Sequence, residues 1–227
     1  MSQPSTRSRA RLRVVLGALA SLVALVVGNA HAEEDRLTLG KKLATEGNSK
    51  GVVACKTCHG EDGAGMAGAD FPRLAGLDAA YLEGQLKHFQ AKQRKNDMMS
   101  PVAAALSVEE RAAVSEYYAS LKAKSNAVAD ASLVSRGKEL AQHGAWDREI
   151  PPCESCHGPA GVGVGVNFPA LAGQHPSYTE AQLAQWKSGV RGGEPLKLMS
   201  AIAANMTEAD MQAAAAYFGS LPVEESP

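Results

Sequence analysis

The 227-residue sequence predicts an all-α protein made of two copies of one unit. Three observations support this fold class. Segments roughly 98 residues apart repeat one another, apolar residues recur every three or four positions within each copy, and alternating strand patterns are scarce. A repeat of this length indicates the tandem duplication of a whole domain.

Several pairs of matching segments make the duplication visible. LGKKLA (39–44) matches RGKELA (136–141), FPRLAG (71–76) matches FPALAG (168–173), and YYASL (117–121) matches YFGSL (217–221). Tyr81, Gln85 and Phe89 likewise correspond to Tyr178, Gln182 and Trp186. Between the copies, residues 122–132 are small and polar, as in a short linker. We therefore expect a first domain at 33–124 and a second at 125–227.

Each copy has three segments with the apolar spacing of amphipathic helices. The expected helices cover 36–47, 77–93 and 107–123 in the first copy, and 132–144, 177–189 and 207–221 in the second. The last helix of each copy begins with a capping residue, which is Ser107 followed by Glu110, or Thr207 followed by Asp210. Glycine and proline cluster after each cysteine motif, which predicts long loops that are functional or wrapped around something.

The first 32 residues have the pattern of a secretory signal peptide. Four arginines between positions 7 and 13 precede an apolar run of about 15 residues, and Ala30-His31-Ala32 supplies the small residues of a cleavage site. A membrane-spanning helix needs ~20 apolar residues, so a retained anchor is the less favoured alternative. We expect cleavage after Ala32, export by the general secretory route and a periplasmic protein.

The charge distribution excludes a nucleic-acid-binding function. The chain has 23 basic and 24 acidic residues, and loss of residues 1–32 removes four arginines and no acid. The imbalance falls in the second domain, which has 6 basic and 11 acidic residues, whereas the first has 13 of each. Nothing resembles the basic stripe that follows a phosphate backbone. The asymmetry can orient the molecule toward a partner.

All four cysteines lie in two Cys-x-x-Cys-His motifs, one in each copy. The motif residues are Cys55, Cys58 and His59, and Cys153, Cys156 and His157. Disulfide bonds are the ordinary use of cysteine in an exported protein. Thiol oxidoreductase pairs occur within βαβ patterns that are absent here, and a four-cysteine zinc site leaves both histidines unexplained. Covalent haem attachment accounts for all six residues.

We therefore expect two covalently attached haem c groups. The two thiols of a motif add to the haem vinyl groups, and the adjacent histidine binds the iron from one side. Two such motifs, in register within a duplicated helical unit, are a specific signal. Aromatic residues make up only 5% of the chain, which agrees with a large apolar group supplied from outside the sequence.

Methionine is the expected sixth ligand of each iron. Met99 and Met199 share a Met-Ser context, 44 and 46 residues after the first cysteine of their copies. Met98 competes in the first copy, but Met199 has no such neighbour, so the repeat favours Met99. Ligation by histidine and methionine raises the reduction potential and closes the iron to small ligands.

Ligation by a second histidine is the alternative for the sixth position. His88, His143 and His175 have no counterparts in the repeat. We expect them to lie at the surface or in hydrogen-bonded helix positions.

With these motifs, the sequence resembles the dihaem class I cytochromes of the cytochrome c4 family. The resemblance rests on CKTCHG, FPRLAG, MS and YYASL in the first copy and on CESCHG, FPALAG, MS and YFGSL in the second, and it covers nearly all of 36–221. It implies two tandem class I cytochrome c domains related by internal duplication, which face each other with their haem edges close together.

The resemblance also implies roles for two glycines and two prolines. Gly40 and Gly137 would let the first helix of each copy cross the last one closely, near the tyrosines at 117 and 217. The carbonyl groups of Pro72 and Pro169 would accept hydrogen bonds from the iron-binding histidines, which fixes each ring and tunes its basicity.

By the same resemblance, the activity is electron transfer in the periplasm, from a quinol-oxidising complex to a haem-copper terminal oxidase. It allows a loose association with the outer face of the membrane, and we expect a monomer without catalytic residues. Gly192 to Pro195, ahead of Met199, have no match in the first copy. The two haems are therefore expected to differ in surroundings and potential.

Three other functions stay open. The chain could be the dihaem subunit of a larger dehydrogenase, such as a flavocytochrome sulfide dehydrogenase, because the fold and haems would be identical. An enzyme is less favoured, because a dihaem thiosulfate dehydrogenase uses an additional cysteine as an iron ligand and a dihaem peroxidase needs a longer chain. A disulfide-bonded binding module is the non-redox alternative.

Overall fold

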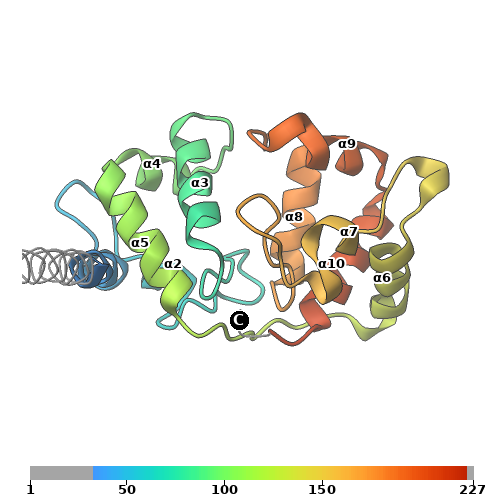
Figure 1. Cartoon of the computed structure of the whole chain (residues 1–227), viewed down its shortest axis with the longest axis horizontal. Coiled ribbons are helices and arrows are strands. Elements are labelled where there is room, and N and C mark those ends of the chain that lie inside the picture. The colour runs from blue at the N-terminus through green and yellow to red at the C-terminus, as the bar shows by residue number, and fades with distance from the viewer. Residues whose placement is uncertain (1–32, 224–227) are drawn as a thin grey trace, which may run out of the picture.

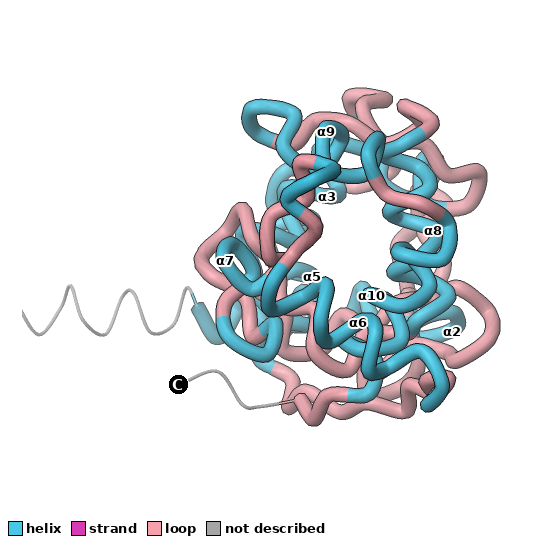
Figure 2. Tube along the Cα trace, turned by 90° about the vertical axis from the view of Figure 1, so that its right-hand side faces the viewer, coloured by secondary structure: helices cyan, strands magenta, loops and turns pink. Residues whose placement is uncertain are grey.

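The computed structural model describes residues 33–223, and these residues form helices joined by loops (Figure 1, Figure 2). Isolated β-bridges occur in this range, but no strand does. The expected signal peptide at 1–32 lies outside the described residues. None of the described helices is long and apolar enough to cross a membrane.

The helices follow the same order in both copies. In the first copy, a helical segment at 33–46 precedes α2 (Lys56–His59), α3 (Ala79–Gln90), α4 (Met99–Ala104) and α5 (Val108–Ser120). In the second copy, α6 (Ala131–His143) precedes α7 (Glu154–His157), α8 (Pro176–Lys187), α9 (Leu198–Asn205) and α10 (Glu208–Ser220). The all-α fold class and the duplication are confirmed, and short helices at the motifs and at the methionines add to the expected ones.

The last helix of each copy begins at a capping box. The Ser107 side chain accepts a hydrogen bond from the Glu110 N–H (3.1 Å), and the Glu110 carboxylate accepts one from the Ser107 N–H (2.7 Å). Thr207 and Asp210 form the same reciprocal pair at the start of α10. Each box satisfies N–H groups that have no intrahelical partner, which fixes the first turn of the helix.

The first and last helices of each copy cross at a glycine. A Cβ atom on Gly40 would lie 2.7 Å from the Cβ of Tyr117, and one on Gly137 would lie 2.7 Å from the Cβ of Tyr217. Packed carbon atoms do not approach so closely, so each crossing needs a residue without a side chain. The structure thus has the close crossing that the resemblance implied.

Each copy has its own hydrophobic core. Leu43, Leu82 and Val114 belong to the first core, against which Cys55 packs. Cys153 packs against a cluster of the second copy that contains Tyr217. Both motifs are therefore seated on the core of their own copy, where the first and last helices cross.

The two copies lie side by side, with α3 and α8 facing each other across the middle of the molecule (Figure 1). One part of their contact has no counterpart in the repeat. The Gln174 side chain accepts a hydrogen bond from the Arg73 N–H (2.9 Å) and donates one to the Arg73 carbonyl (3.0 Å). The Arg73 guanidinium donates to the Ala172 carbonyl of the other copy (3.0 Å). The other part joins α3 to α8 through residues that do match in the repeat.

Candidate functional site

The Cys-x-x-Cys-His motifs form the short helices α2 and α7. Cys55 and Cys153 are the N-caps of these helices, and the motif histidines are their last residues. The two cysteines of a motif are three positions apart, so their thiols lie on one face of a helical turn. One flat group can therefore contact both thiols of a motif. Burial also raises the pKa of the Cys55 and Cys153 thiols to about 11.

The motif histidines are buried, with His59 6% and His157 8% exposed. The Nδ1 of His59 lies 3.0 Å from the Pro72 carbonyl oxygen, and that of His157 lies 2.8 Å from the Pro169 carbonyl oxygen. A carbonyl can only accept, so Nδ1 carries the proton and Nε2 keeps its lone pair. Burial lowers the pKa of both imidazoles more than the carbonyls raise it, which favours the neutral form. A neutral imidazole held at Nδ1 is suited to bind a metal through Nε2.

Glycine-rich loops bring each proline carbonyl to its histidine. In the first copy, the Gly65 N–H donates to the His59 carbonyl (2.9 Å), and the backbone of Met66 pairs with that of Phe71. In the second copy, Gly163 donates to the motif histidine in the same way (2.7 Å). Gly65 and Gly163 have φ values of +80° and +89°, which glycine adopts without a steric cost. The long loops thus position the residue that orients the imidazole.

The candidate sixth ligands lie at the start of the short helices α4 and α9. Met99 is the first residue of α4, and its N–H donates to the Asn96 side chain (2.9 Å). Met99 is partly buried, whereas Met98 is exposed, in agreement with the choice made from the repeat. Met199 packs against the second core, as does Trp186. Coordination of iron by these methionines stays a prediction.

The remaining histidines occupy different environments. His143 is exposed, and His88 is partly buried. His175 is the N-cap of α8 and only 1% exposed, and its Nε2 donates to the Ala64 carbonyl of the other copy (3.0 Å). It therefore belongs to the contact between the copies, and the repeat gave no signal for it because the first copy has no matching histidine.

The contact between α3 and α8 contains two buried arginines whose role the sequence pattern did not predict. Arg94 is 7% and Arg191 4% exposed, and their backbones form an isolated antiparallel bridge. The repeat does pair these arginines, because Arg94 and Arg191 are 97 positions apart, as are Gln85 and Gln182. The lengths of the two segments before the methionines differ, which hid this match.

Two alternative uses of the cysteines are not supported. No disulfide bond joins the cysteines of the described residues. In the part of the chain that the structure describes, no group of three or more histidine, cysteine or acidic side chains could hold a metal ion. The four-cysteine zinc site therefore lacks the necessary geometry.

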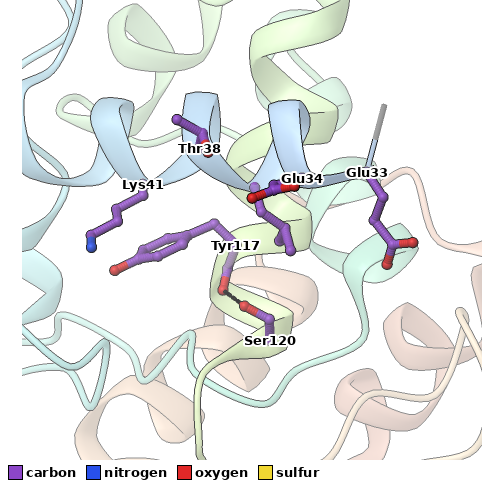
Figure 3. Close-up of a pocket in the computed structure, with 7 residues that line it drawn as sticks. Glu33, Glu34, Thr38, Lys41, Tyr117 and Ser120 are labelled. Atoms are coloured by element: carbon purple, nitrogen blue, oxygen red, sulfur yellow. Dashed lines mark hydrogen bonds between the residues drawn. The ribbon is translucent and has the colours of Figure 1, made fainter. Parts of the chain in front are cut away.

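The hollow drawn in Figure 3 contains no motif residue. It forms where the helical segment at 33–46 lies beside α5, and its lining includes Glu33, Thr38, Lys41 and Tyr117. The Ser120 hydroxyl donates to the Tyr117 carbonyl at its edge (2.8 Å). The hollow is a consequence of the helix crossing and does not belong to the candidate site.

Two protein families match the chain, one in each copy. The family described as Cytochrome c matches residues 37–122, and the family described as Cytochrome C oxidase, cbb3-type, subunit III matches residues 137–218. Each match includes one Cys-x-x-Cys-His motif. Two cytochrome c domains with cysteine pairs at 55/58 and 153/156 indicate two covalently attached haem c groups, which confirms the predicted cofactor.

Two similar proteins align with most of this chain. A thiosulfate dehydrogenase electron acceptor of Stutzerimonas stutzeri (strain A1501) is 46% identical over 190 residues, which are 82% of this chain and 88% of that protein. Cytochrome c4 of Pseudomonas aeruginosa is 35% identical over 198 residues, which are 86% of this chain and 93% of that protein.

A solved structure shows the same fold. A thiosulfate dehydrogenase (TsdBA) from Marichromatium purpuratum has a TM-score of 0.80 and 45% sequence identity, over 82% of this chain and 40% of that chain. This chain therefore spans less than half the length of that longer protein, and the likeness concerns one part of it.

Proposed function

The chain belongs to the cytochrome c4 family of dihaem class I c-type cytochromes, and on this premise we propose that it accepts electrons from a thiosulfate-oxidising dehydrogenase. It is an electron carrier and not an enzyme. The observation that carries the proposal is its identity of 46% with an electron acceptor of that kind, against 35% with a cytochrome c4. A solved thiosulfate dehydrogenase contains a region similar to this chain, which supports the same partner.

Each copy has the residues to hold one haem. Cys55, Cys58, Cys153 and Cys156 would attach the haems covalently, His59, Met99, His157 and Met199 would bind the irons, and Pro72 and Pro169 would orient the histidines. The bound haem supplies a one-electron couple at its iron. Ligation by histidine and methionine would close the iron to small molecules and favour electron transfer over ligand binding.

Two haems in one chain suit a donor that releases electrons in pairs. The removal of two electrons from a sulfur compound needs two one-electron acceptors, and the duplicated domain provides both in one encounter. Both motif histidines are buried, so a substrate of the donor would not reach the iron from the histidine side. The electrons must therefore arrive from another protein docked on the surface.

A second role is supported by the 35% identity to a cytochrome c4, namely transfer from a quinol-oxidising complex to a terminal oxidase. It uses the same two haems and differs only in the partners.

For both roles we place the protein in the periplasm, with 1–32 as a cleaved signal peptide and with domains at 33–124 and 125–227. The basic start, apolar run and small-residue exit of the first 32 residues support this location.

The test is the reduction of the oxidised holoprotein by a purified thiosulfate dehydrogenase, followed through the absorbance of the ferrous haems. We expect dehydrogenase and thiosulfate together to reduce both haems, and each alone to leave them largely oxidised. Dithionite defines the full amplitude in the same cuvette. If the dehydrogenase leaves the haems oxidised while a quinol-oxidising complex reduces them, the first role is wrong and the second replaces it.

A further inference from the structure

The backbone that follows Pro72 is held by a side chain of the second copy. The Arg73 N–H donates to the Gln174 side-chain oxygen (2.9 Å), and the Gln174 side-chain nitrogen donates to the Arg73 carbonyl (3.0 Å). Arg73 is 1% and Gln174 4% exposed, so water does not compete for these hydrogen bonds. One glutamine of the second copy therefore binds both polar backbone groups of one residue of the first.

These hydrogen bonds meet the candidate iron ligand at a single peptide group. The Pro72 carbonyl accepts from the Nδ1 of His59 (3.0 Å), and the Arg73 N–H that donates to Gln174 belongs to the same peptide unit. A chain of hydrogen bonds therefore runs from the His59 imidazole, through this peptide, to the Gln174 oxygen. Hydrogen bonds in such a chain polarise one another, so donation by the N–H makes the carbonyl a better acceptor for the imidazole proton.

A second contact holds the same loop. The His175 Nε2 donates to the Ala64 carbonyl (3.0 Å), and the His175 N–H donates to the Gln174 side-chain oxygen (3.1 Å). Ala64 precedes Gly65, whose N–H bonds the His59 carbonyl (2.9 Å). Burial lowers the pKa of His175 more than the Ala64 carbonyl raises it, which favours the neutral imidazole. Two adjacent residues of the second copy thus fix the loop at both places where it bonds His59.

The residues that match Gln174 and His175 in the first copy do not offer the reverse contact. They are Leu77 and Asp78. Leu77 belongs to the first core and has no hydrogen-bonding side chain, and the Asp78 carboxylate accepts from the Tyr81 N–H at the start of α3 (2.8 Å). His175 is likewise the N-cap of its helix, but its side chain bonds the other copy instead. The arrangement therefore acts on the first iron ligand alone.

The matching loop of the second copy has different surroundings. Val162 matches Ala64 and is 37% exposed, whereas Ala64 is 6% exposed. Ala170 matches Arg73, is partly buried and packs against the hydrophobic core of the first copy. Across the contact, the peptide beside Pro169 thus meets apolar side chains at the place where the peptide beside Pro72 meets an acceptor.

We propose that Gln174 is a positioning residue for the iron ligand of the first copy, although it belongs to the second. Its side chain holds and polarises the peptide between Pro72 and Arg73, and this peptide holds the Nδ1 proton of His59. The imidazole is thereby a stronger electron donor at Nε2. A stronger donor stabilises the oxidised iron more than the reduced iron, which lowers the reduction potential of the first haem. His175 supports the arrangement by fixing the Ala64 carbonyl.

The two iron sites then differ through one neutral side chain. Only the first haem has a histidine ligand tied to the contact between the copies, so the distribution of one electron between the two haems depends on Gln174. This inference rests on the proposed binding of iron by His59 and is independent of the identity of the electron donor. A paramagnetic shift of the His59 ring nuclei in the oxidised wild type tests that ligation separately.

The test is Gln174→Met, which keeps the length and neutrality of the side chain and removes its donor and acceptor. Both reduction potentials are measured in the holoprotein by a redox titration followed by NMR, with signals assigned through the ring nuclei of His59 and His157. We expect the equilibrium constant for moving an electron from the second haem to the first to rise about threefold, because the polarisation of one peptide is worth less than a whole hydrogen bond. This rise is about 28 mV at ~59 mV per tenfold.

The nitrogen resonance of the imidazole gives a second readout in the same samples. In Gln174→Met, the Nδ1 resonance of His59 is expected to move in the direction of a weaker hydrogen bond, while that of His157 stays in place. An unchanged first potential, or an equal change at both haems, would overturn the proposal.

Arg73→Gln is the matched control for a loosened contact between the copies. It removes the guanidinium that donates to the Ala75 (2.6 Å) and Ala172 (3.0 Å) carbonyls, but it leaves the backbone groups that Gln174 binds. We expect the Nδ1 resonance of His59 to stay in place and the first potential to fall, because a nearby cation favours the reduced iron. A rise like that of Gln174→Met would show that loosening alone is responsible, and the proposal would fail.

Gln174→Glu separates the acceptor from the donor and decides the question if Gln174→Met fails to acquire its haems. It keeps a side-chain oxygen for the Arg73 N–H and loses the group that donates to the Arg73 carbonyl. We expect the first potential to stay the same or to fall, with the Nδ1 resonance of His59 at or beyond its wild-type position. A rise of the first potential with the acceptor still present would contradict the proposal.

Discussion

The two copies of the domain agree where they hold the haem and differ where their last helix begins. The motif histidines bond their proline carbonyls at 3.0 and 2.8 Å, and both copies cross their first and last helices at a glycine. At the helix start, however, Glu110 is bonded by Asn48 (3.1 Å) and Lys50 (3.4 Å), whereas Asp210 is buried and bonded by two arginines, Arg136 and Arg148. The residues that would hold the haem therefore share one geometry, while the charges around the start of the last helix differ.

The loops after the motifs also differ between the copies, in the charge of their exposed residues. The first loop carries Glu61, Asp62 and Asp70, whereas the second carries the exposed apolar residues Val162, Val164 and Val166. Both loops nevertheless bring a proline carbonyl to the histidine. The two copies therefore present one charged and one apolar surface next to equivalent sites, which allows a partner to distinguish between them.

A substitution at the helix crossing that both copies share should lower the free energy of unfolding most, and by the same amount in each copy. Gly40→Ala and Gly137→Ala are each expected to lower the free energy of unfolding by ~1–3 kcal/mol or more, because a methyl group would overlap the facing helix. Denaturant unfolding of the holoprotein, followed by circular dichroism, measures this. Gly84→Ala is the matched control, because no atom beyond its chain neighbours and its own helix backbone lies within 4 Å of the added Cβ.

The control should move in the opposite direction. Replacement of an unstrained helical glycine by alanine is expected to stabilise the protein by ~0.5–1 kcal/mol. Stability unchanged by either Gly40→Ala or Gly137→Ala would show that the copy concerned tolerates a wider helix crossing, and the claim of common geometry would be lost.

Neutralising the acid at the start of the last helix, where the copies differ, should lower the free energy of unfolding less, and by a different amount in each copy. Burial alone would raise the pKa of Asp210, but hydrogen bonds from Arg148, Thr207 and Arg136 hold it well below its usual range. The carboxylate thus contributes stability above the ordinary aspartate pKa of ~3.9, and this contribution is lost as the pH falls through the lowered value. Asp210→Asn is expected to cost ~1.5–3 kcal/mol at neutral pH and to flatten the acid limb of the stability profile.

The matched variant in the first copy is Glu110→Gln. Hydrogen bonding to Ser107 lowers the pKa of Glu110 in the same direction, but its cationic partner Lys50 is exposed. We expect a cost of about 1 kcal/mol or less. Unfolding measured from acid to neutral pH compares the two variants, and equal losses would show that the two helix starts do not differ energetically.

The features that the sequence predicted well depend on neighbouring residues. The capping boxes at Ser107 and Thr207 and the amphipathic helices need only local spacing, and the structure has them. The motif histidines, Met99 and Met199 were chosen because each recurs in the repeat, and their binding to iron stays a prediction. Local pattern and duplication together therefore predicted the fold class and the cofactor.

The contact between the copies could not be predicted in the same way. Arg73 bonds Gln174, 101 positions away, and neither residue has a polar counterpart in the repeat. His175 is a hydrogen-bonded histidine at a helix start, which was one of the two expectations, but its acceptor is the Ala64 carbonyl of the other copy. Such pairs join residues of different domains, so no local periodicity in the sequence records them.

The central claim is that both copies bind iron in the same way, through a histidine held by a proline carbonyl and a methionine on the opposite side. The most direct test is the absorption spectrum of the oxidised holoprotein, with the weak long-wavelength band that methionine–iron bonding produces measured per haem. We predict a band with the intensity of two haems. A band of half that intensity, or none, would contradict the claim, because at least one of Met99 and Met199 would then not be a ligand.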